Sequence, residues 1–425
     1  MKDILAELRW RGLLHQSTDE KELTELLAKP QTVYVGFDPT ASSLHAGSLL
    51  PLMTLRRFQQ FGHRPIALVG GATGMIGDPS GKSQERNLLS PEILEENVNG
   101  LREQMSRFLD FEADQPALLV NNFDWMGSWS YIDFLREVGK NFPVNVMLAK
   151  DSVKTRLGKE DSGLSYTEFS YMLLQAYDFA HLAEKYDCAL QVGGSDQWGN
   201  ITAGIDLARR MHGKHLQALT CPLLLTSDGS KMGKTANGAV WLDGGRTSPY
   251  EFFQYWYNVP DSDVMMCIKF LTEIDQEECT DLEKQTSEDP GKRAAQTRLA
   301  SWLTEFIHGA EALQTAEKAR EILFGKAEIT GMTDAQIDQI FSGVPSGEVT
   351  QADLSDGINI VDALAAAGVA SSKSDARRTA KEGGASVNNV KVGEDKVLTT
   401  ADLASESTIV LRRGKKKFGL LRVKG

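Results

Sequence analysis

The sequence predicts an α/β fold that opens with a doubly wound parallel sheet. β-rich segments alternate with helical segments through the first half of the chain, and several predicted strands run directly into glycine-rich turns. This alternation favours parallel strands joined by helical crossovers, and it brings the turns together at the carboxyl edge of the sheet. We therefore expect a Rossmann-like domain that binds its ligands at this edge.

The elements of this domain follow from local signals. Pro39 ends the first strand, and Gly62 stops the helical stretch that runs from about residue 47 to residue 61. The second strand leads into the glycine-rich segment 70–78, and a later helix ends near Gly213. The predicted strands cover residues 32–38, 65–69, 189–192 and 219–225.

The rest of the chain changes character twice. After Pro249 the pattern indicates helical runs rich in Glu, Gln, Lys and Ala. From Ile358 it indicates a compact α+β module, with a helix beginning near Ser372 and short strands around 385–387 and 408–411. We expect four parts: the sheet domain at 1–247, an α-helical domain at 248–326, a linker at 327–356 and a small α+β domain at 357–425.

The composition is typical of a globular protein in a reducing compartment. The 425 residues are 41% hydrophobic and 24% charged, and no apolar run approaches the roughly 18 residues that a transmembrane helix needs. The first residues form no signal peptide, and the four cysteines include no CxxC pair, which argues against structural zinc. We expect a cytoplasmic protein with no membrane association, no metal site and no tightly bound cofactor.

Charge is distributed unevenly along the chain. Residues 371–425 contain 13 Lys and Arg against 6 Asp and Glu, whereas the whole chain has a net charge of −12. A basic tail on an acidic body favours contact with a polyanion, although a solvated charged surface explains the charge equally well.

The glycine-rich segment does not match the common phosphate-binding loops. A Walker loop needs a glycine five residues before its Gly-Lys pair, where Ile76 stands, and the glycines also miss the GxGxxG spacing. They can serve simply to turn a strand tightly into a helix. Asp78, Lys82 and Arg86 are better candidates, because a carboxylate can hold an ammonium group while cations face phosphates.

Two short motifs carry the main functional signal. His45-Ala46-Gly47-Ser48 precedes a helix N-terminus, where free N–H groups favour anions. Lys231-Met232-Gly233-Lys234-Thr235 lies in a polar stretch, 226–238, which we expect to be a mobile loop that closes over phosphates. Taken singly, an exposed histidine and a solvated lysine loop are the better explanations. Together, the motifs predict a site that handles the triphosphate of ATP without a Walker loop.

The two motifs resemble the signature of class I aminoacyl-tRNA synthetases. Three longer segments narrow the resemblance to the bacterial tyrosyl-tRNA synthetases, and it spans essentially the whole chain. These segments are Tyr34-Val35-Gly36-Phe37-Asp38-Pro39-Thr40, Gly74-Met75-Ile76-Gly77-Asp78-Pro79-Ser80-Gly81-Lys82 and Gly193-Gly194-Ser195-Asp196-Gln197-Trp198-Gly199-Asn200. The resemblance implies a tyrosine–tRNA ligase, which forms tyrosyl-adenylate from L-tyrosine and ATP, releases pyrophosphate and transfers the tyrosyl group to the 3′-terminal ribose of tRNA(Tyr).

The resemblance also implies a tyrosine pocket. Two of its residues would bond the phenolic hydroxyl, three would hold the ammonium group, and Gln197 would lie near the reacting centre. The first two are Tyr34 and Asp178, and the three are Asp78, Tyr171 and Gln175. Spacing supports part of this set independently, because Tyr171, Gln175 and Asp178 stand at i, i+4 and i+7 on one helix face; an ordinary amphipathic helix has the same spacing.

A second implied set surrounds ATP, which Mg²⁺ would accompany. The residues implied to act on the phosphates are Thr40, His45, Lys82, Arg86, Lys231, Lys234 and Thr235. Those implied to bind the rest of ATP, together with the two lysines, are Gly36, Asp38, Gly47, Ser48, Gly193 and Asp196. Catalysis would be positioning and electrostatic stabilisation without a covalent enzyme intermediate.

Two positions depart from the family pattern. The first motif often ends in His, and Ser48 stands there, so a hydroxyl would replace the ribose contact only through shorter reach or a water. The second motif commonly has serines where Gly233 and Thr235 stand, and both lysines remain.

The tail resembles an S4-type RNA-binding module, on the segments 362–364, 371–378 and 383–388. Few aromatic residues are present, so base stacking is not the expected mode, and binding should weaken with salt. The implied tRNA-binding residues are Arg377, Arg378, Lys381, Arg412, Arg413, Lys415, Lys416 and Lys417.

The family further implies a homodimer that pairs through the catalytic domain and an insertion near 122–168, with the helical domain on the anticodon side. A tryptophan-specific relative is disfavoured by Tyr34, Asp178 and the tail. A nucleotidyltransferase with the histidine motif would lack both the pocket and the tail. An RNA-binding or RNA-splicing protein that lost ligase activity stays open because of Ser48.

Overall fold

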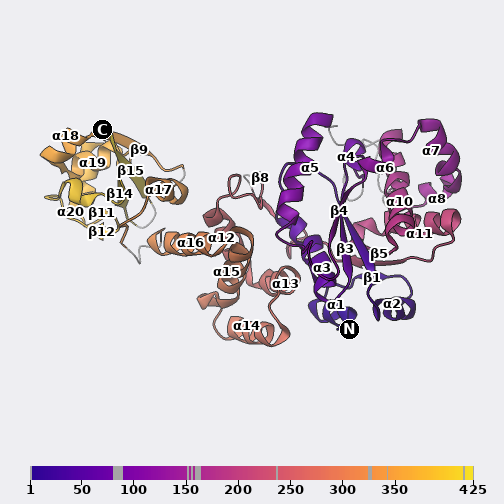
Figure 1. Ribbon diagram of the computed structural model, residues 1–425. Coiled ribbons are helices and arrows are strands. Elements are labelled where there is room, and N and C mark those ends of the chain that lie inside the picture. The colour runs from indigo at the N-terminus through magenta and orange to yellow at the C-terminus, as the bar shows by residue number, and fades with distance from the viewer. Residues whose placement is uncertain are drawn as a thin grey trace. The chain divides into compact units, whose positions relative to one another are not determined.

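The computed structural model describes residues 2–79, 90–150, 153–154, 157, 164–235, 238–323, 328–341, 343–414 and 417–424. The chain forms two compact units, shown in Figure 1. The first unit comprises residues 1–247 and 257–299, and the second comprises residues 248–256 and 300–425.

A six-stranded sheet forms the centre of the first unit, in the order β1-β6-β5-β2-β3-β4. All neighbouring strands are parallel except β1, which is antiparallel to β6. The strands are β1 (Gln16–Ser17), β2 (Thr32–Phe37), β3 (Arg64–Val69), β4 (Leu118–Asn121), β5 (Cys188–Gly194) and β6 (Gln217–Cys221). The predicted doubly wound α/β fold is therefore confirmed, and the chain changes direction across the sheet between β2 and β5.

Helices cover this sheet, and their ends follow local capping chemistry. The longest described helix, α10, begins after Ser165, whose side chain accepts a hydrogen bond from the Glu168 N–H, and ends at Asp187 in the left-handed conformation. The helices of this unit are α1 (Ile4–Arg11), α2 (Glu20–Leu27), α3 (Leu49–Gln60), α4 (Thr73–Ile76), α5 (Pro91–Met105), α6 (Phe123–Met126), α7 (Tyr131–Glu137), α8 (Val144–Leu148), α10 (Tyr166–Tyr186), α11 (Trp198–His212), α13 (Asp261–Leu271) and α14 (Gln276–Glu288). Within the described part of the chain, no helix is long and apolar enough to cross a bilayer.

The predicted helical segment 248–326 is helical where it is described, but its helices divide between the two units. Besides α13 and α14, it contains α12 (Pro249–Tyr257), α15 (Ala294–His308) and α16 (Ala310–Leu323). Its assignment as a separate domain on the anticodon side stays a prediction.

The C-terminal part of the second unit is the predicted small α+β module. Its sheet has the order β12-β11-β14-β15-β9, and a two-stranded sheet pairs β10 with β13. The strands are β9 (Ser346–Thr350), β10 (Ile358–Asn359), β11 (Ala385–Val387), β12 (Val390–Lys391), β13 (Val397–Leu398), β14 (Thr408–Arg413) and β15 (Lys417–Lys424), and the helices are α17 (Asp334–Ile340), α18 (Gln351–Asp356), α19 (Ile360–Ala366) and α20 (Lys373–Lys381).

The predicted linker at 327–356 is wrong. β9 lies within it and pairs in parallel with β15, and Ile337 and Phe341 are buried in a core that also contains Phe418. The segment looked irregular because β9 is short and alternates exposed and half-buried residues, and because its hydrogen-bonding partner is about 70 residues away in the sequence. The C-terminal domain therefore begins well before residue 357.

Candidate active site

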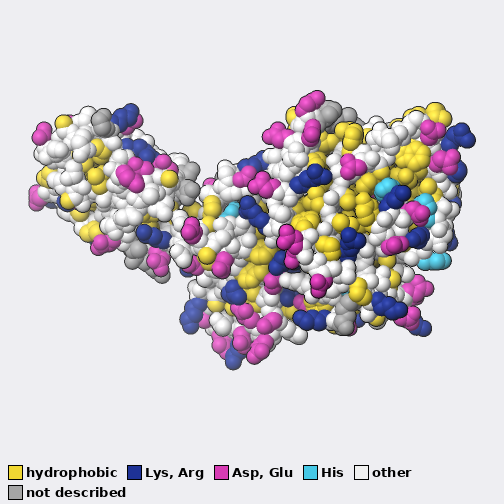
Figure 2. Space-filling view, viewed as in Figure 1, with side chains coloured by type: hydrophobic (Ala, Val, Ile, Leu, Met, Phe, Trp, Pro, Cys, Tyr) yellow, Lys and Arg dark blue, Asp and Glu magenta, His cyan; other side chains and the backbone are white. Residues whose placement is uncertain are grey.

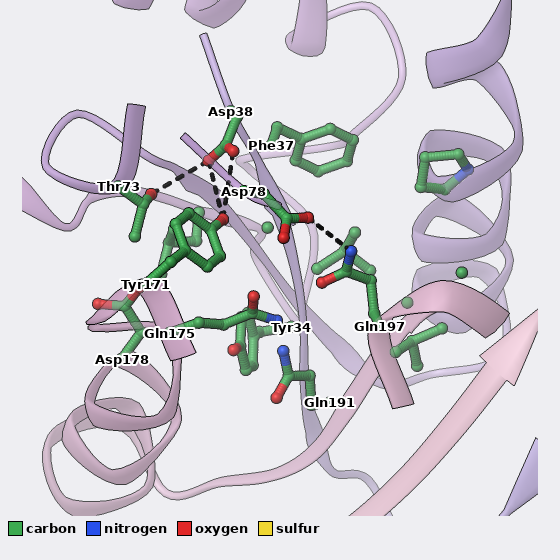
Figure 3. Close-up of a pocket in the computed structure, with 17 residues that line it drawn as sticks. Tyr34, Phe37, Asp38, Thr73, Asp78, Tyr171, Gln175, Asp178, Gln191 and Gln197 are labelled. Carbon is green, nitrogen blue, oxygen red and sulfur yellow. Dashed lines mark hydrogen bonds between the residues drawn. The ribbon is translucent and has the colours of Figure 1, made fainter. Parts of the chain in front are cut away.

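A cavity of about 250 Å³ opens where the sheet changes direction, at the carboxyl ends of β2 and β5 (Figure 3). This is the place where open α/β sheets bind ligands. The cavity is lined by all six residues implied to bind tyrosine, Tyr34, Asp78, Tyr171, Gln175, Asp178 and Gln197, and by Gly36, Asp38 and Gly193 from the ATP set. The sequence-based residues thus come together in one hollow.

Helix α10 supplies one wall of the cavity. Tyr171, Gln175 and Asp178 all line it, as their spacing predicted, and α10 packs closely on α11 through small residues such as Ala176 and Gly204. A side chain at position 204 would press against Phe179, at 3.0 Å. The close helix pair holds this wall rigidly beside β2.

Tyr34 and Asp178 form a buried end of the cavity. The Tyr34 side chain is 1% exposed, and within the described residues its hydroxyl has no hydrogen-bond partner. Burial, and then the nearby Asp178, raise the pKa of Tyr34 well above 10, and the Gln191 side chain, too far away for a full hydrogen bond, acts weakly in the opposite direction. The Tyr34 hydroxyl therefore stays protonated and is available to a ligand.

Two neighbouring side chains hold the Asp178 carboxylate in place. Asn122 Nδ2 donates to one of its oxygens at 2.9 Å, and Trp125 Nε1 donates to the other at 2.8 Å. Burial raises the pKa of Asp178 to about 7 although both hydrogen bonds act in the opposite direction. Each carboxylate oxygen keeps a second lone pair, so Asp178 can still accept a bond from a ligand hydroxyl.

Three polar residues at this end were not predicted from the sequence. Asn122 and Trp125 follow β4, a short strand that was not predicted, and Gln191 lies within β5. Gln191 is 3% exposed and lines the cavity, and its Oε1 has no partner among the described residues. A glutamine in an otherwise apolar strand, two residues before the Gly193-Gly194 pair, was a signal that could have identified it.

A second group of polar contacts surrounds Asp38. The Tyr171 hydroxyl donates to its carboxylate at 3.2 Å, and Thr73 Oγ1 donates at 3.1 Å. Burial and the charge of Asp38 raise the pKa of Tyr171 well above 10. Asp38 was implied to bind ATP and Tyr171 to bind tyrosine, so their contact joins the two predicted halves of the site.

Asp78 belongs to a chain of amide contacts. Gln197 Nε2 donates to Asp78 Oδ2 at 2.8 Å, and Asn200 Nδ2 donates to the side-chain oxygens of Gln197 at 3.2 Å and Gln175 at 3.1 Å. Figure 3 shows Asp78 and Gln197 pointing toward each other at one side of the cavity. A carboxylate together with amide oxygens is a suitable environment for an ammonium group.

The two short motifs lie against each other. The Ala46 N–H donates to the Val240 carbonyl, and the Val240 N–H donates to the Gly233 carbonyl. Gly233 has a φ of +89°, and a side chain there would meet Ala46 and the Gly47 nitrogen at 3.0 Å. Glycine is required at this position by both the backbone conformation and the close approach.

His45 and Ser48 cap the turn at Ala46–Ser48. His45 Nδ1 accepts from the Gly47 N–H at 3.0 Å, and burial followed by the charge of Lys234 lowers the pKa of His45. The Ser48 hydroxyl accepts from the His45 N–H at 3.5 Å, so it closes a reciprocal cap. This contact gives Ser48 a structural role at the position that usually holds histidine.

The cationic side of the site is exposed where it is described. Thr40, Lys231 and Lys234 are exposed, and Lys231 lowers the pKa of Asp196, which burial and Asp78 raise. Lys82 and Arg86 lie outside the described residues, as does the side chain of Thr235. The predicted cluster around the phosphates is therefore placed only in part.

The predicted tRNA-binding residues of the tail differ in availability. Arg377, Lys381 and Lys417 are exposed, while Lys415 and Lys416 lie outside the described residues. Arg378 and Arg413 both pair with Asp375, and the hydrogen bond from Arg413, followed by those from Ser371, lowers the pKa of that carboxyl. The Arg412 guanidinium is half-buried and lies over the Phe418 ring at 5.7 Å from its centroid.

Comparison with known proteins places this site in a family context. Residues 27–325 match the family described as tRNA synthetases class I (W and Y), and residues 336–421 match the tyrosine–tRNA ligase SYY-like C-terminal domain. The chain is 60% identical to the tyrosine–tRNA ligase of Rhodopirellula baltica over 423 residues, which is 99% of this chain and 96% of that protein. It is 52% identical to the tyrosine–tRNA ligase of Roseiflexus castenholzii over the full length of both chains. A C-terminally truncated mitochondrial tyrosyl-tRNA synthetase of Coccidioides posadasii has a similar structure, with a TM-score of 0.66, 32% identity and coverage of 75% of this chain and 92% of that chain.

Proposed function

This chain belongs to the class I tRNA synthetases of the W and Y family, and we propose that it works as a tyrosine–tRNA ligase through the cavity described above. It uses ATP to activate L-tyrosine, and the tyrosyl group then passes to tRNA(Tyr). The observation that carries the choice of tyrosine is the buried pair of Tyr34 and Asp178 at one end of the cavity. A phenolic hydroxyl entering this end can donate to Asp178 and accept from Tyr34.

The remaining polar groups suit the amino-acid end of the substrate. Asp78, with Gln175 and Tyr171 beside it, provides oxygen atoms for the ammonium group, and Gln197 lies next to Asp78. Holding both ends of tyrosine leaves its carboxylate to face the phosphates. Preorganised positioning of this kind removes much of the entropic barrier to reaction.

In the activation step, a tyrosine carboxylate oxygen attacks the α-phosphorus of ATP, and the bond to pyrophosphate breaks. His45, Lys231 and Lys234 stabilise the charge that builds on the phosphates, and Lys82, Arg86, Thr40 and Thr235 complete this set as implied by the family. Mg²⁺ would accompany ATP and would shield part of the charge on its phosphates. In the second step a ribose hydroxyl of tRNA attacks the tyrosyl carbonyl, and AMP leaves.

A homodimer fits the exposed apolar side chains near the predicted insertion. Tyr131, Ile132, Val144, Val146 and Tyr166 are each at least half exposed. A group of exposed apolar side chains in one region of a protein is typical of an interface, whereas single ones are common on any surface. They come from α7, α8 and the start of α10, on a side of the first unit where Figure 2 shows hydrophobic atoms. A second copy of the chain would cover them.

A cytoplasmic location fits the same assignment, because the four cysteines are all buried and unpaired. The basic tail would hold tRNA through its phosphates, with Arg377, Lys381 and Lys417 exposed for this purpose.

The experiment that tests this function is amino-acid-dependent exchange of pyrophosphate into ATP, without tRNA, for tyrosine, phenylalanine and tryptophan. Exchange with tyrosine alone supports both the adenylate chemistry and the phenol-binding end. Exchange with tryptophan would assign the chain to the other branch of the family, and no exchange with any of the three would refute the proposal.

A further inference from the structure

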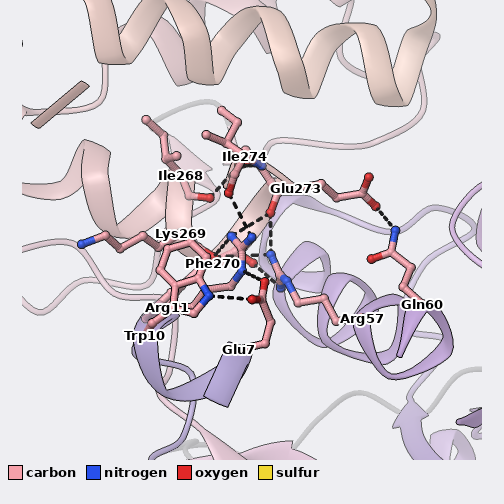
Figure 4. A network of polar contacts seen from close by, with 11 residues as sticks. Glu7, Trp10, Arg11, Arg57, Gln60, Ile268, Lys269, Phe270, Glu273 and Ile274 are labelled. Carbon is pink, nitrogen blue, oxygen red and sulfur yellow. Dashed lines mark hydrogen bonds and ion pairs between the residues drawn. The ribbon is translucent and has the colours of Figure 1, made fainter. Parts of the chain in front are cut away.

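Two buried arginines donate hydrogen bonds to backbone carbonyl groups at the C-terminal end of helix α13 (Figure 4). Arg57 on α3 is 2% exposed and donates to the carbonyl oxygens of Phe270 at 2.8 Å and Thr272 at 2.6 Å. Arg11 on α1 donates to the carbonyl of Ile274 at 2.9 Å. Carbonyl groups at a helix C-terminus lack partners within the helix and attract cations. Since α3 begins next to Ser48, these contacts join α13 to the helix that follows the first motif.

The N-terminal half of α13 contacts the lysine loop, which we define as residues 226–238. Asp263 is 3% exposed, and its carboxylate accepts from the Ser227 N–H at 3.2 Å and from the Ser262 hydroxyl at 2.9 Å. One helical turn further, the Cys267 thiol lies 3.4 Å from the Met232 sulfur, and both residues are buried. Positions 263 and 267 share one helix face, so a single face of α13 holds the loop at two points.

Backbone hydrogen bonds connect residues of the described part of the loop to one another and to the preceding segment. The Thr226 N–H donates to the Ser230 carbonyl at 2.9 Å, and the Met232 N–H donates to the Leu224 carbonyl at 3.0 Å. Ser227 therefore cannot shift without moving the segment that carries Lys231. The Lys231 and Lys234 side chains are exposed, while their backbone is held by a bridge of Lys231 to Leu225 and by pairing of Lys234 with Ala239. The attachment of the loop to α13 adds to these contacts in fixing where the two lysines lie.

We propose that Asp263 is a positioning residue that holds the lysine loop against α13 and so sets where Lys231 and Lys234 meet ATP. The inference rests on the proposed function, in which both lysines act at the phosphates. A buried carboxylate that accepts a backbone N–H forms one of the stronger hydrogen bonds in proteins. Its removal leaves the Ser227 N–H without its acceptor and frees the loop at its first attachment point, while the tyrosine end of the cavity keeps all its contacts.

The test compares Asp263→Ala and Asp263→Asn with Lys269→Met in tyrosine-dependent pyrophosphate exchange. Lys269 is a matched control, because it lies on the same helix but its side chain pairs with Glu283 at 2.6 Å. Asp263→Ala should lower kcat/KM for ATP by about tenfold or more, as expected for loss of a hydrogen bond to a charged group, and leave equilibrium binding of L-tyrosine unchanged. Asp263→Asn keeps one oxygen that can accept from Ser227, and should recover part of the loss. Lys269→Met should match the unmodified enzyme.

Limited digestion with trypsin gives a readout that does not depend on catalysis. Cleavage after Lys231 and Lys234 should become faster in Asp263→Ala than in Lys269→Met, and bound ATP should slow it again. If Asp263→Ala does not fold, Ser227→Pro removes the same N–H donor, together with the Ser227 hydroxyl contacts to Ser262 and Asp263, without changing a residue of the helix. It should give at least the same loss toward ATP. Unchanged kinetics toward ATP, or an equal loss of tyrosine binding, would overturn the inference. Absence of tyrosine-dependent exchange in the unmodified enzyme would refute the proposed function instead.

Discussion

Replacing Tyr34 by phenylalanine should lower the preference of this enzyme for tyrosine over phenylalanine. The Tyr34 hydroxyl is buried and has no partner among the described residues, so its expected partner is the phenol of the substrate. A neutral hydrogen bond contributes about 0.5–1.5 kcal/mol net, which corresponds to about a 2- to 13-fold loss of kcat/KM for tyrosine. Phenylalanine as a substrate leaves the Tyr34 hydroxyl unpaired in the unmodified enzyme, so kcat/KM for phenylalanine should not fall in Tyr34→Phe.

The assay is pyrophosphate exchange with each amino acid, together with the thermal unfolding midpoint. Tyr186→Phe is a matched control, because Tyr186 lies at the end of α10 and does not line the cavity. The unfolding midpoint of Tyr34→Phe should stay level or rise, since the hydroxyl loses only a weak interaction with the Gln191 side chain. An unchanged ratio of the two kcat/KM values, or a midpoint several degrees lower, would show that the hydroxyl supports the fold and does not recognise the substrate.

Three further predictions concern the motifs, the buried carboxylate and the tail. Gly233→Ala should reduce exchange more than Gly229→Ala, because both glycines have positive φ but only position 233 faces Ala46 and Gly47, at 3.0 Å. The pKa of Asp178 is raised from 3.8 to about 7, so its protonated form stabilises the folded protein below about pH 4, and this contribution is lost as the pH rises to 7. The free energy of unfolding measured with urea should therefore fall more steeply between pH 4 and pH 7 than it does in Asp178→Asn. Truncation after residue 356 should keep exchange and weaken tRNA charging. It should also leave a less soluble protein than truncation after residue 323, because the longer variant retains β9 without β15.

The sequence was sufficient to predict the parallel sheet and the wall of the cavity on α10. Both rest on local patterns, namely strands that end in glycine-rich turns and three polar residues at helical spacing. The same kind of pattern placed the helices and the main strands of the tail, at 385–387 and 408–411, close to where the structure has them.

The failures involve partners that are distant in the sequence. β9 was missed because its pairing depends on β15, and Asn122 and Trp125 were missed because their function is to hold Asp178, 56 and 53 positions away. Ser48 was seen as a departure, but its role as a cap depends on the backbone of His45, which only coordinates reveal. Long-range pairing of this kind is set by tertiary structure and leaves no local periodicity.

The two ends of the site differ in how far their polar groups are buried. At the tyrosine end, Tyr34 and Gln191 keep buried polar atoms without described partners, and Asp178 is held rigidly in a place that raises its pKa. Such groups lower stability until a ligand pairs with them, so the same feature that weakens the free protein makes an imperfect substrate costly. At the end proposed for the phosphates, the described lysines are exposed and therefore hydrated in the free protein. Because exposed charges discriminate poorly, we expect the buried end to select the amino acid, and the lysine loop with its support on α13 to control how well the selected tyrosine reacts.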